Sequence, residues 1–195
     1  MKELSLNILD IVENSCKAEA TLVKIIILED DERLTVSIED NGMGMTNETL
    51  LSVTNPFYTT RTTRKVGMGI PLFKLAAEQT GGSIKITSNH ISDKTKEHGT
   101  TLTALFYKNH IDFTPLGNVI DTLITLIQGH PTIDFLYMHS NGESTVTLET
   151  AKLRAVLEDV PLNSFEILAW IRENLEEQYN EKHKNNIEIK ERKKT

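Results

Sequence analysis

The chain has 195 residues, of which 38% are hydrophobic and 25% charged, so it is long enough for one substantial core or two small ones. Its net charge of −7 argues against nucleic acid as the main ligand, because a phosphate backbone requires a basic face. The sequence has neither a secretion leader nor an apolar run long enough to span a membrane, and its lone cysteine, Cys16, fits a reducing compartment. We therefore expect a cytoplasmic protein without a membrane partner.

The chain is predicted to open with a helix from Glu3 to Ala18, since apolar residues recur there at helical spacing. Its expected core face comprises Leu4, Ile8, Ile11, Val12 and Ser15. On another face, Asp10, Asn14 and Lys17 share one stripe, because steps of four and seven residues return to nearly the same direction. This stripe is either a solvated face or a functional one, in which an acid takes a proton, an amide oxygen binds a hard cation and a base meets phosphate.

Two strands, Val23–Leu28 and Leu34–Ile38, are predicted to form a hairpin around an acidic turn. The second strand leads into Asp40-Asn41-Gly42-Met43-Gly44, where the two glycines permit a sharp turn and the close approach of a flat ligand. A carboxylate only accepts hydrogen bonds, so Asp40 suits the exocyclic amine of adenine and not the oxygen of guanine. Ordinary turns contain the same residues, so the surrounding sequence has to decide.

A short helix is predicted at Thr46–Leu50, followed by a polar, basic loop over residues 55–65. This loop suits either a flexible surface segment or a lid over a charged ligand. Gly67-Met68-Gly69 opens a helix predicted at Ile70–Gln79, and the free backbone N–H groups of such a helix start suit phosphate. The predicted sheet is completed by two strands, Ser83–Ser88 and Thr100–Tyr107.

Taken in order, the helix stripe, the Asp40 turn, the lid-like loop, Gly67–Gly69 and Gly99-Thr100 resemble the five nucleotide-binding boxes of the GHKL ATPase superfamily. That group comprises gyrase B, heat-shock chaperones, histidine kinases and MutL. The resemblance covers about Glu3 to Lys108 and implies the Bergerat ATP-binding fold, an α+β two-layer sandwich with helices on one face of a mixed sheet. Val12-Glu13-Asn14-Ser15 is similar to MutL, whereas Gly67–Lys74 is similar to histidine kinases.

The resemblance also implies a role for each matching residue. Asn14 would coordinate Mg²⁺, Lys17 would lie near the phosphates, and Asp40 would read adenine with the help of a water held at Thr100. ATP and Mg²⁺ are therefore the expected cofactors. The complete set of expected nucleotide-binding residues is Asn14, Lys17, Asp40, Gly42, Gly44, Met45, Thr59, Thr60, Arg61, Lys65, Val66, Gly67, Met68, Gly69 and Thr100.

Two positions depart from the family pattern. Lys65 replaces the first glycine of the usual Gly-x-Gly-x-Gly segment, so either the lid is stiffer or Lys65 itself touches phosphate. Asp10 lies four residues before Asn14, where hydrolysing members carry Glu. Asp10 is one methylene shorter than Glu, and it is the candidate general base.

Three functions remain open at this point. The leading one is Mg²⁺-dependent ATP binding with weak hydrolysis, used as a nucleotide-gated switch on a protein partner. The second is a serine/threonine kinase that acts in trans like the anti-sigma-factor kinases, and the third is a non-catalytic ATP/ADP-sensing module. A sensor kinase is disfavoured, because none of the six histidines lies in an acceptor helix ahead of the ATP domain.

We expect residues 1–110 to form the ATP-binding domain, residues 111–181 a small α+β unit for partner contact, and residues 182–195 a basic, disordered tail. The elements predicted in the α+β unit are helices at Pro115–Gln128, Thr150–Glu158 and Asn163–Tyr179 and a hairpin of Thr132–Met138 with Thr145–Glu149. The whole pattern resembles small ATP-binding proteins of anaerobic bacteria, often encoded beside iron-hydrogenase or related electron-transfer subunits. That resemblance implies a redox-enzyme or regulatory partner, and the sequence leaves a dimer open.

Overall fold

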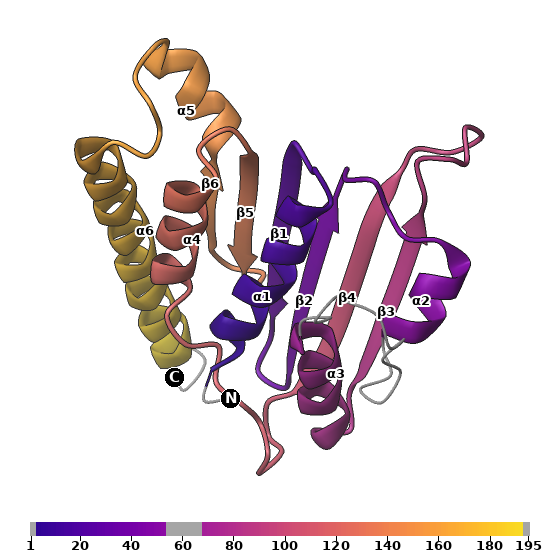
Figure 1. Ribbon diagram of the computed structural model, residues 1–195. Coiled ribbons are helices and arrows are strands. Elements are labelled where there is room, and N and C mark those ends of the chain that lie inside the picture. The colour runs from indigo at the N-terminus through magenta and orange to yellow at the C-terminus, as the bar shows by residue number, and fades with distance from the viewer. Residues whose placement is uncertain (1–2, 54–67, 193–195) are drawn as a thin grey trace.

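The computed structural model describes residues 3–53 and 68–192, with side chains up to residue 184. Strands and helices alternate irregularly along the chain (Figure 1). In order, the elements are α1 (Leu4–Lys17), β1 (Leu22–Glu29), β2 (Arg33–Asp40), α2 (Asn47–Val53), α3 (Gly69–Gln79), β3 (Ser83–Asn89), β4 (Gly99–Tyr107), α4 (Val119–Gly129), β5 (Asp134–Ser140), β6 (Thr145–Glu149), α5 (Thr150–Leu157) and α6 (Phe165–Arg192).

The strands form one six-stranded sheet in the order β3-β4-β2-β1-β5-β6. The β1–β5 pair is parallel, whereas β1–β2, β2–β4, β3–β4 and β5–β6 are antiparallel, so the sheet is mixed. The acidic hairpin predicted from the sequence is the β1–β2 pair, in which Ile25 lies opposite Ile38. The predicted α+β class and mixed sheet are confirmed.

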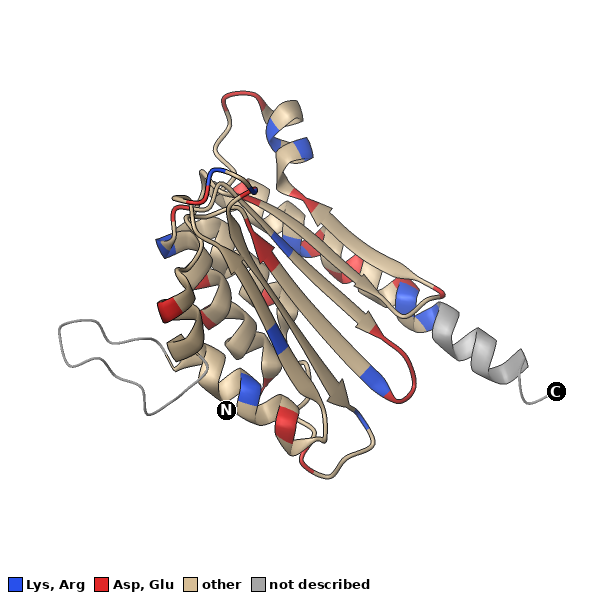
Figure 2. Cartoon of the chain, turned by 90° about the vertical axis from the view of Figure 1, so that its right-hand side faces the viewer, with Lys and Arg blue, Asp and Glu red and all other residues tan. Residues whose placement is uncertain are grey.

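In the part of the chain that the structure describes, the helices cover one face of the sheet and leave the other open. Along that face α3 contacts α1, α1 contacts α4, and α4 contacts α6. Figures 1 and 2 show this helical layer to one side of the strands. Alternate residues of β1 and β2 point into it and are buried, as the period of two in a half-covered sheet requires. The inward residues are Val23, Ile25, Ile27, Leu34, Val36 and Ile38.

Helix α1 lies in the middle of this layer, and its predicted core face is confirmed. Leu4, Ile8, Ile11, Val12 and Ser15 are all buried. Its first turn is fixed from the C-terminal half of the chain, because Leu4 N donates to Pro115 O at 2.9 Å and Ser5 N to Leu116 O at 2.8 Å. Two of the N–H groups that a helix start leaves free are satisfied in this way.

The expected C-terminal unit contributes two strands to the same sheet. Strand β5 pairs in parallel with β1, with Ile25 opposite Tyr137, and β6 pairs with β5. Phe135 and Tyr137 are buried in the same core as the residues of β1. The sheet is therefore continuous across residue 110. The boundary expected there marks the end of the sequence motifs and does not divide the sheet.

Helix α6 is longer than predicted. It was expected to end at Tyr179 and to give way to a disordered tail at residue 182, but it continues to Arg192. Where the tail was expected to begin, Lys182 is instead buried with 4% exposure, and its ammonium lies 3.5 Å from Glu29 at the end of β1. The part of the chain that the structure describes contains no helix long and apolar enough to cross a membrane.

Candidate nucleotide-binding site

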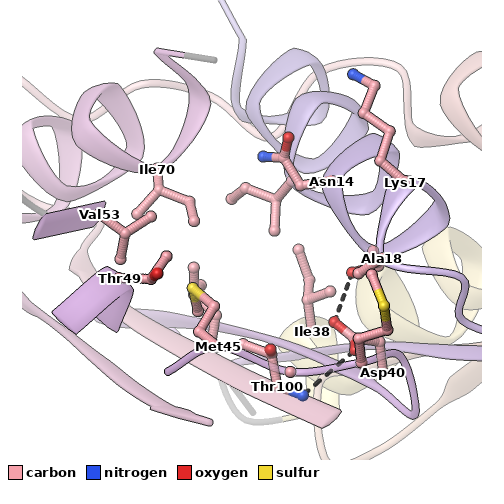
Figure 3. A pocket seen from close by; sticks show the side chains of 15 residues that line it. Asn14, Lys17, Ala18, Ile38, Asp40, Met45, Thr49, Val53, Ile70 and Thr100 are labelled. Carbon is pink, nitrogen blue, oxygen red and sulfur yellow. Dashed lines mark hydrogen bonds between the residues drawn. The ribbon is translucent and has the colours of Figure 1, made fainter. Parts of the chain in front are cut away.

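A cavity of about 630 Å³ lies between α1, α2, the start of α3 and the strands β2 and β4 (Figure 3). Its volume suits a small organic ligand. Of the residues expected at a nucleotide, six line it: Asn14, Lys17, Asp40, Gly44, Met45 and Thr100. Much of the remaining wall is apolar and comes from Ile11, Ile38, Val53, Ile70 and Leu102.

Asp40, at the end of β2, is held in one orientation by three hydrogen bonds. Ser15 Oγ donates to Asp40 Oδ2 at 2.7 Å, Gly42 N donates to Oδ1 at 2.9 Å, and Thr100 N donates to Oδ1 at 3.3 Å. The donors come from α1, from the turn after β2 and from β4. A carboxylate offers about four lone-pair sites, so after the donors of the described residues one acceptor position remains for a ligand.

The turn after Asp40 is packed too tightly to accept side chains at its glycines. A Cβ on Gly42 would lie 2.7 Å from Ala18 O. A Cβ on Gly44 would lie 1.9 Å from Asn89 O, and Gly44 also has φ of +68°, which L residues rarely adopt. Both glycines are therefore required by the fold, whatever the turn binds.

Asn41 anchors the same turn to the start of β1. Its side-chain oxygen accepts hydrogen bonds from Thr21 N and Leu22 N, each at 2.9 Å. Its amide nitrogen donates to Thr21 Oγ1 at 2.8 Å. The Asp-Asn-Gly segment is consequently fixed on both sides.

Asn14 and Lys17 lie on the α1 wall, away from Asp40 and Thr100 (Figure 3). Asn14 is half-buried and Lys17 is exposed, so one presents an amide to the cavity and the other a cation at its rim. The cavity thus has an acceptor for a base at one end and groups suited to a metal ion and to phosphate elsewhere.

Asp10 lies one turn of α1 before Asn14, is exposed, and is absent from the cavity wall. It contacts the start of α3, because a Cβ on Gly69 would lie 2.8 Å from Asp10 Cβ. Gly69 itself is buried, and the neighbouring Met68 is 65% exposed. α1 and α3 thus meet at Asp10, beside the N-terminus of α3.

Of the other nine expected residues, Gly42, Met68 and Gly69 do not line the cavity, and six fall outside the described part of the chain. These six are Thr59, Thr60, Arg61, Lys65, Val66 and Gly67.

Three residues of the site were not predicted as contacts. Ser15 was expected in the core, and it is buried, but its hydroxyl also donates to Asp40. Ser88 Oγ accepts from Met45 N at 2.7 Å and lies 2.9 Å from Thr100 Oγ1. His98 Nδ1 lies 2.7 Å from Gly42 O. The sequence carries no local signal for these contacts, since the partners are far apart in the chain.

Cys16 lies beside the site without reactive character. Burial, with a smaller contribution from Glu13, raises the pKa of its thiol to about 11, so it remains protonated at neutral pH. Within residues 3–53 and 68–184, no three His, Cys, Asp or Glu side chains gather as metal ligands.

A half-covered mixed sheet, with a carboxylate acceptor at the end of one strand and a polar helix wall opposite it, is an arrangement that suits a nucleotide. Residues 2–110, more than half of the chain, match the family described as histidine kinase-, DNA gyrase B-, and HSP90-like ATPases. The chain therefore belongs to that ATPase family.

The similarity to individual proteins is more limited. Over 85 residues the chain is 31% identical to a protein of Shewanella frigidimarina (strain NCIMB 400) provisionally named as a sensor protein. The match covers 42% of this chain and 13% of that protein, so the chain spans a small part of its relative.

Two solved structures are similar at low identity. The N-terminal domain of a DNA repair protein matches with a TM-score of 0.51 and 17% identity, over 76% of this chain and 53% of that one. The MutL ATPase domain of Aquifex aeolicus, complexed with ADP, matches with a TM-score of 0.48 and 14% identity, over 81% of this chain and 70% of that one. The first likeness shows the fold alone.

Proposed function

We propose that this protein binds ATP with Mg²⁺ in the cavity between α1 and β2, hydrolyses it slowly, and uses the bound nucleotide to regulate a protein partner in the cytoplasm. One observation carries the proposal. The Asp40 carboxylate is fixed by three donors and keeps an acceptor position at a cavity that Asn14 and Lys17 also line.

The base specificity follows from the chemistry of Asp40. Adenine presents an amine that can donate to the free acceptor position of the carboxylate, whereas guanine presents an oxygen there. Asp40 is half-buried, and a carboxylate that faces an oxygen in such a site loses a hydrogen-bond partner, at a cost of about 1–3 kcal/mol, or roughly a tenfold preference for adenine. The apolar walls, which include Ile38 and Ile70, suit the two faces of a purine ring.

The polar residues on α1 suit a triphosphate with its metal ion. Asn14 offers an amide oxygen, which fits Mg²⁺ because this ion takes few protein ligands and completes its shell with phosphate and water. When bound, the ion would neutralise charge on the phosphates. Lys17 adds a flexible cation at the rim of the cavity, where it can pair with phosphate oxygens.

Asp10 is our candidate general base for water attack on the terminal phosphate. Its position beside Gly69 places it near the start of α3, and the N-terminus of a helix suits phosphate. In this role Asp10 accepts the proton of the attacking water as the new P–O bond forms and ADP leaves. The shorter Asp side chain is consistent with slow turnover.

Substituting Asp10→Asn should leave ATP affinity unchanged and abolish phosphate release, since an amide cannot accept the proton. Calorimetry measures the first quantity and a phosphate-release assay the second. Asp10→Glu is the matched control, because it restores the reach of a longer acid and should retain or raise turnover. Turnover by the Asn variant at the rate of the unsubstituted protein would reject the role of Asp10.

The regulatory part of the proposal is supported by the position of α1. This helix lines the cavity. Its Glu13, next to Asn14, contacts His130 at the end of α4, with 2.9 Å between Glu13 Oε1 and His130 Nε2. A change at the nucleotide can therefore reach the C-terminal residues through α1. Among the C-terminal residues, Val156 in α5 and Phe165 at the start of α6 are more than 80% exposed. Large apolar side chains exposed on a protein surface suit contact with a partner.

A further inference from the structure

The connection between β3 and β4, residues 90–98, lies against the turn that follows Asp40. Ile91 N donates to Met43 O at 2.8 Å. At the other end of the connection, His98 Nδ1 lies 2.7 Å from Gly42 O. A carbonyl oxygen only accepts, so Nδ1 of His98 carries a hydrogen and donates it.

Gly42 links this histidine to the carboxylate. Gly42 N donates to Asp40 Oδ1 at 2.9 Å, while Gly42 O accepts from His98. The residue is buried and has no room for a side chain against Ala18. Its two peptide groups are thus fixed from opposite sides, one by Asp40 and the other by His98.

We propose that His98 is a positioning residue for adenine: its Nδ1–H fixes Gly42, and Gly42 in turn holds the Asp40 carboxylate toward the purine amine. The inference rests on the proposed ATP site and deepens it. His98 never touches the nucleotide in this arrangement. Its effect is to keep the acceptor position of Asp40 aligned before the ligand arrives, which lowers the cost of binding.

His98 is a good position for a test because its side chain is exposed. Removing it leaves no cavity in the core, so folding and nucleotide affinity can be measured separately. Loss of one hydrogen bond that orders the turn should weaken ATP binding by about three- to tenfold.

The experiment measures ATP·Mg²⁺ affinity by calorimetry for the full chain and for His98→Ala, His98→Asn and His98→Gln. The amide nitrogen of Asn can take the place of Nδ1, whereas that of Gln lies one bond farther out. We expect the Ala and Gln variants to lose affinity and the Asn variant to stay within about twofold of the unsubstituted chain. If His98 contributed only to the general stability of the protein, the His98→Asn and His98→Gln variants should bind ATP with the same affinity.

His90→Ala is the matched control. His90 belongs to the same connection, and its Nδ1 bonds Ser92 Oγ at 2.8 Å within it. We expect its ATP affinity to be unchanged. If His98→Ala binds ATP like the unsubstituted chain, or if His98→Asn binds no better than His98→Ala, the positioning role is wrong. If the unsubstituted chain gives no heat with ATP·Mg²⁺, the proposed site itself fails, and the role of His98 fails with it.

Discussion

At the scale of residues, the site is held together by contacts of two kinds, some within a short segment and others across the fold. Asp40, Gly42 and Gly44 form a short local motif, and Asn14 has a fixed place on a predicted helix, so sequence patterns find them. Ser15 and His98 act across the fold. The Ser15–Asp40 bond spans 25 positions and the His98–Gly42 bond 56, and no local pattern encodes contacts of that kind.

The bond from Ser15 to Asp40 should contribute to ATP affinity. Ser15 is 4% exposed, and its hydroxyl donates to a charged acceptor at 2.7 Å. Removing a hydrogen bond to a charged group costs about 1.5–3 kcal/mol, so Ser15→Ala should weaken ATP binding by at least tenfold in calorimetry. Ser52→Ala is the control, since Ser52 Oγ is exposed and bonds only within α2 to Thr49 O at 2.7 Å among the contacts described. Equal affinity in both variants would show that Asp40 does not need this donor.

Gly44 should tolerate no side chain. In Gly44→Ala the new Cβ would meet Asn89 O at 1.9 Å, in a backbone conformation at φ +68° that already costs an L residue about 1–2 kcal/mol. We expect a lower melting temperature and loss of ATP binding. Gly129→Ala, at the end of α4, has nothing within 4 Å of its Cβ and should melt at or slightly above the temperature of the unsubstituted chain. A Gly44→Ala protein that binds ATP normally would mean that the turn adapts.

At the scale of elements, α6 packs on the sheet through contacts that the amino-acid composition of its C-terminal part does not predict. Residues 182–192 look like a polar, basic tail, but Lys182 is anchored to Glu29, which lies 153 positions earlier in the chain. Four residues before, Gln178 exchanges hydrogen bonds with Thr147 N and O at 2.8 and 3.1 Å. These bonds occupy backbone groups on the free side of edge strand β6, which protects the edge from pairing with another chain.

A polar cluster at the ends of β1 and β5 completes this docking. His139, 4% exposed, lies with Nε2 3.1 Å from Glu29 Oε1 and with Nδ1 2.8 Å from Tyr179 Oη. Tyr179 also bonds the hydroxyl of Tyr137. Burial raises the pKa of Tyr179 to about 12 and the pKa of Tyr137 well above its usual value, so both phenols stay protonated at neutral pH.

The cluster predicts a specific acid sensitivity. The hydrogen bond from His139, aided by Lys108 and Lys182, lowers the pKa of Glu29 from 4.5 to about 2. Because the folded state prefers the ionised carboxylate, the stabilisation is complete above pH 4.5 and is lost as the pH falls from 4.5 to about 2. The difference corresponds to about 3 kcal/mol.

Chemical unfolding of the native chain and of Glu29→Gln at several pH values measures this contribution. The gap between their unfolding free energies should be largest at neutral pH and should shrink as the pH falls from 4.5 toward 2. A gap that stays constant over this range would show that Glu29 does not account for the acid sensitivity.

At the scale of the whole molecule, the sequence motifs and the sheet have different boundaries. The nucleotide motifs end near residue 110, and the family match ends there too. The sheet continues through β5 and β6, and α4 packs on α1. Sequence motifs indicate which residues contact a ligand. They do not reveal the parallel pairing of β1 with β5, because this pairing joins segments more than 100 positions apart.

A chain cut after residue 110 should therefore not fold by itself. It would expose the β1 backbone along the whole pairing with β5 and remove Leu123, Phe135 and Tyr137 from the shared core. We expect no cooperative thermal transition for residues 1–110. A chain of residues 1–184 is the matched control, since it keeps Lys182 and should unfold cooperatively. A sharp transition in the shorter chain would mean that the ATPase-family segment is an independent domain.

Calorimetry with ATP and Mg²⁺ tests the central claim most directly, by comparing the native chain with Asp40→Asn. The substitution replaces one carboxylate oxygen of residue 40 with an NH₂ group. The donors that fix Asp40 then no longer hold a carboxylate toward the purine amine. The account predicts saturable heat for the native chain, weaker heat with GTP, and a loss of at least tenfold in ATP affinity for the variant. Absence of heat with ATP, or equal affinity in the two proteins, would contradict it.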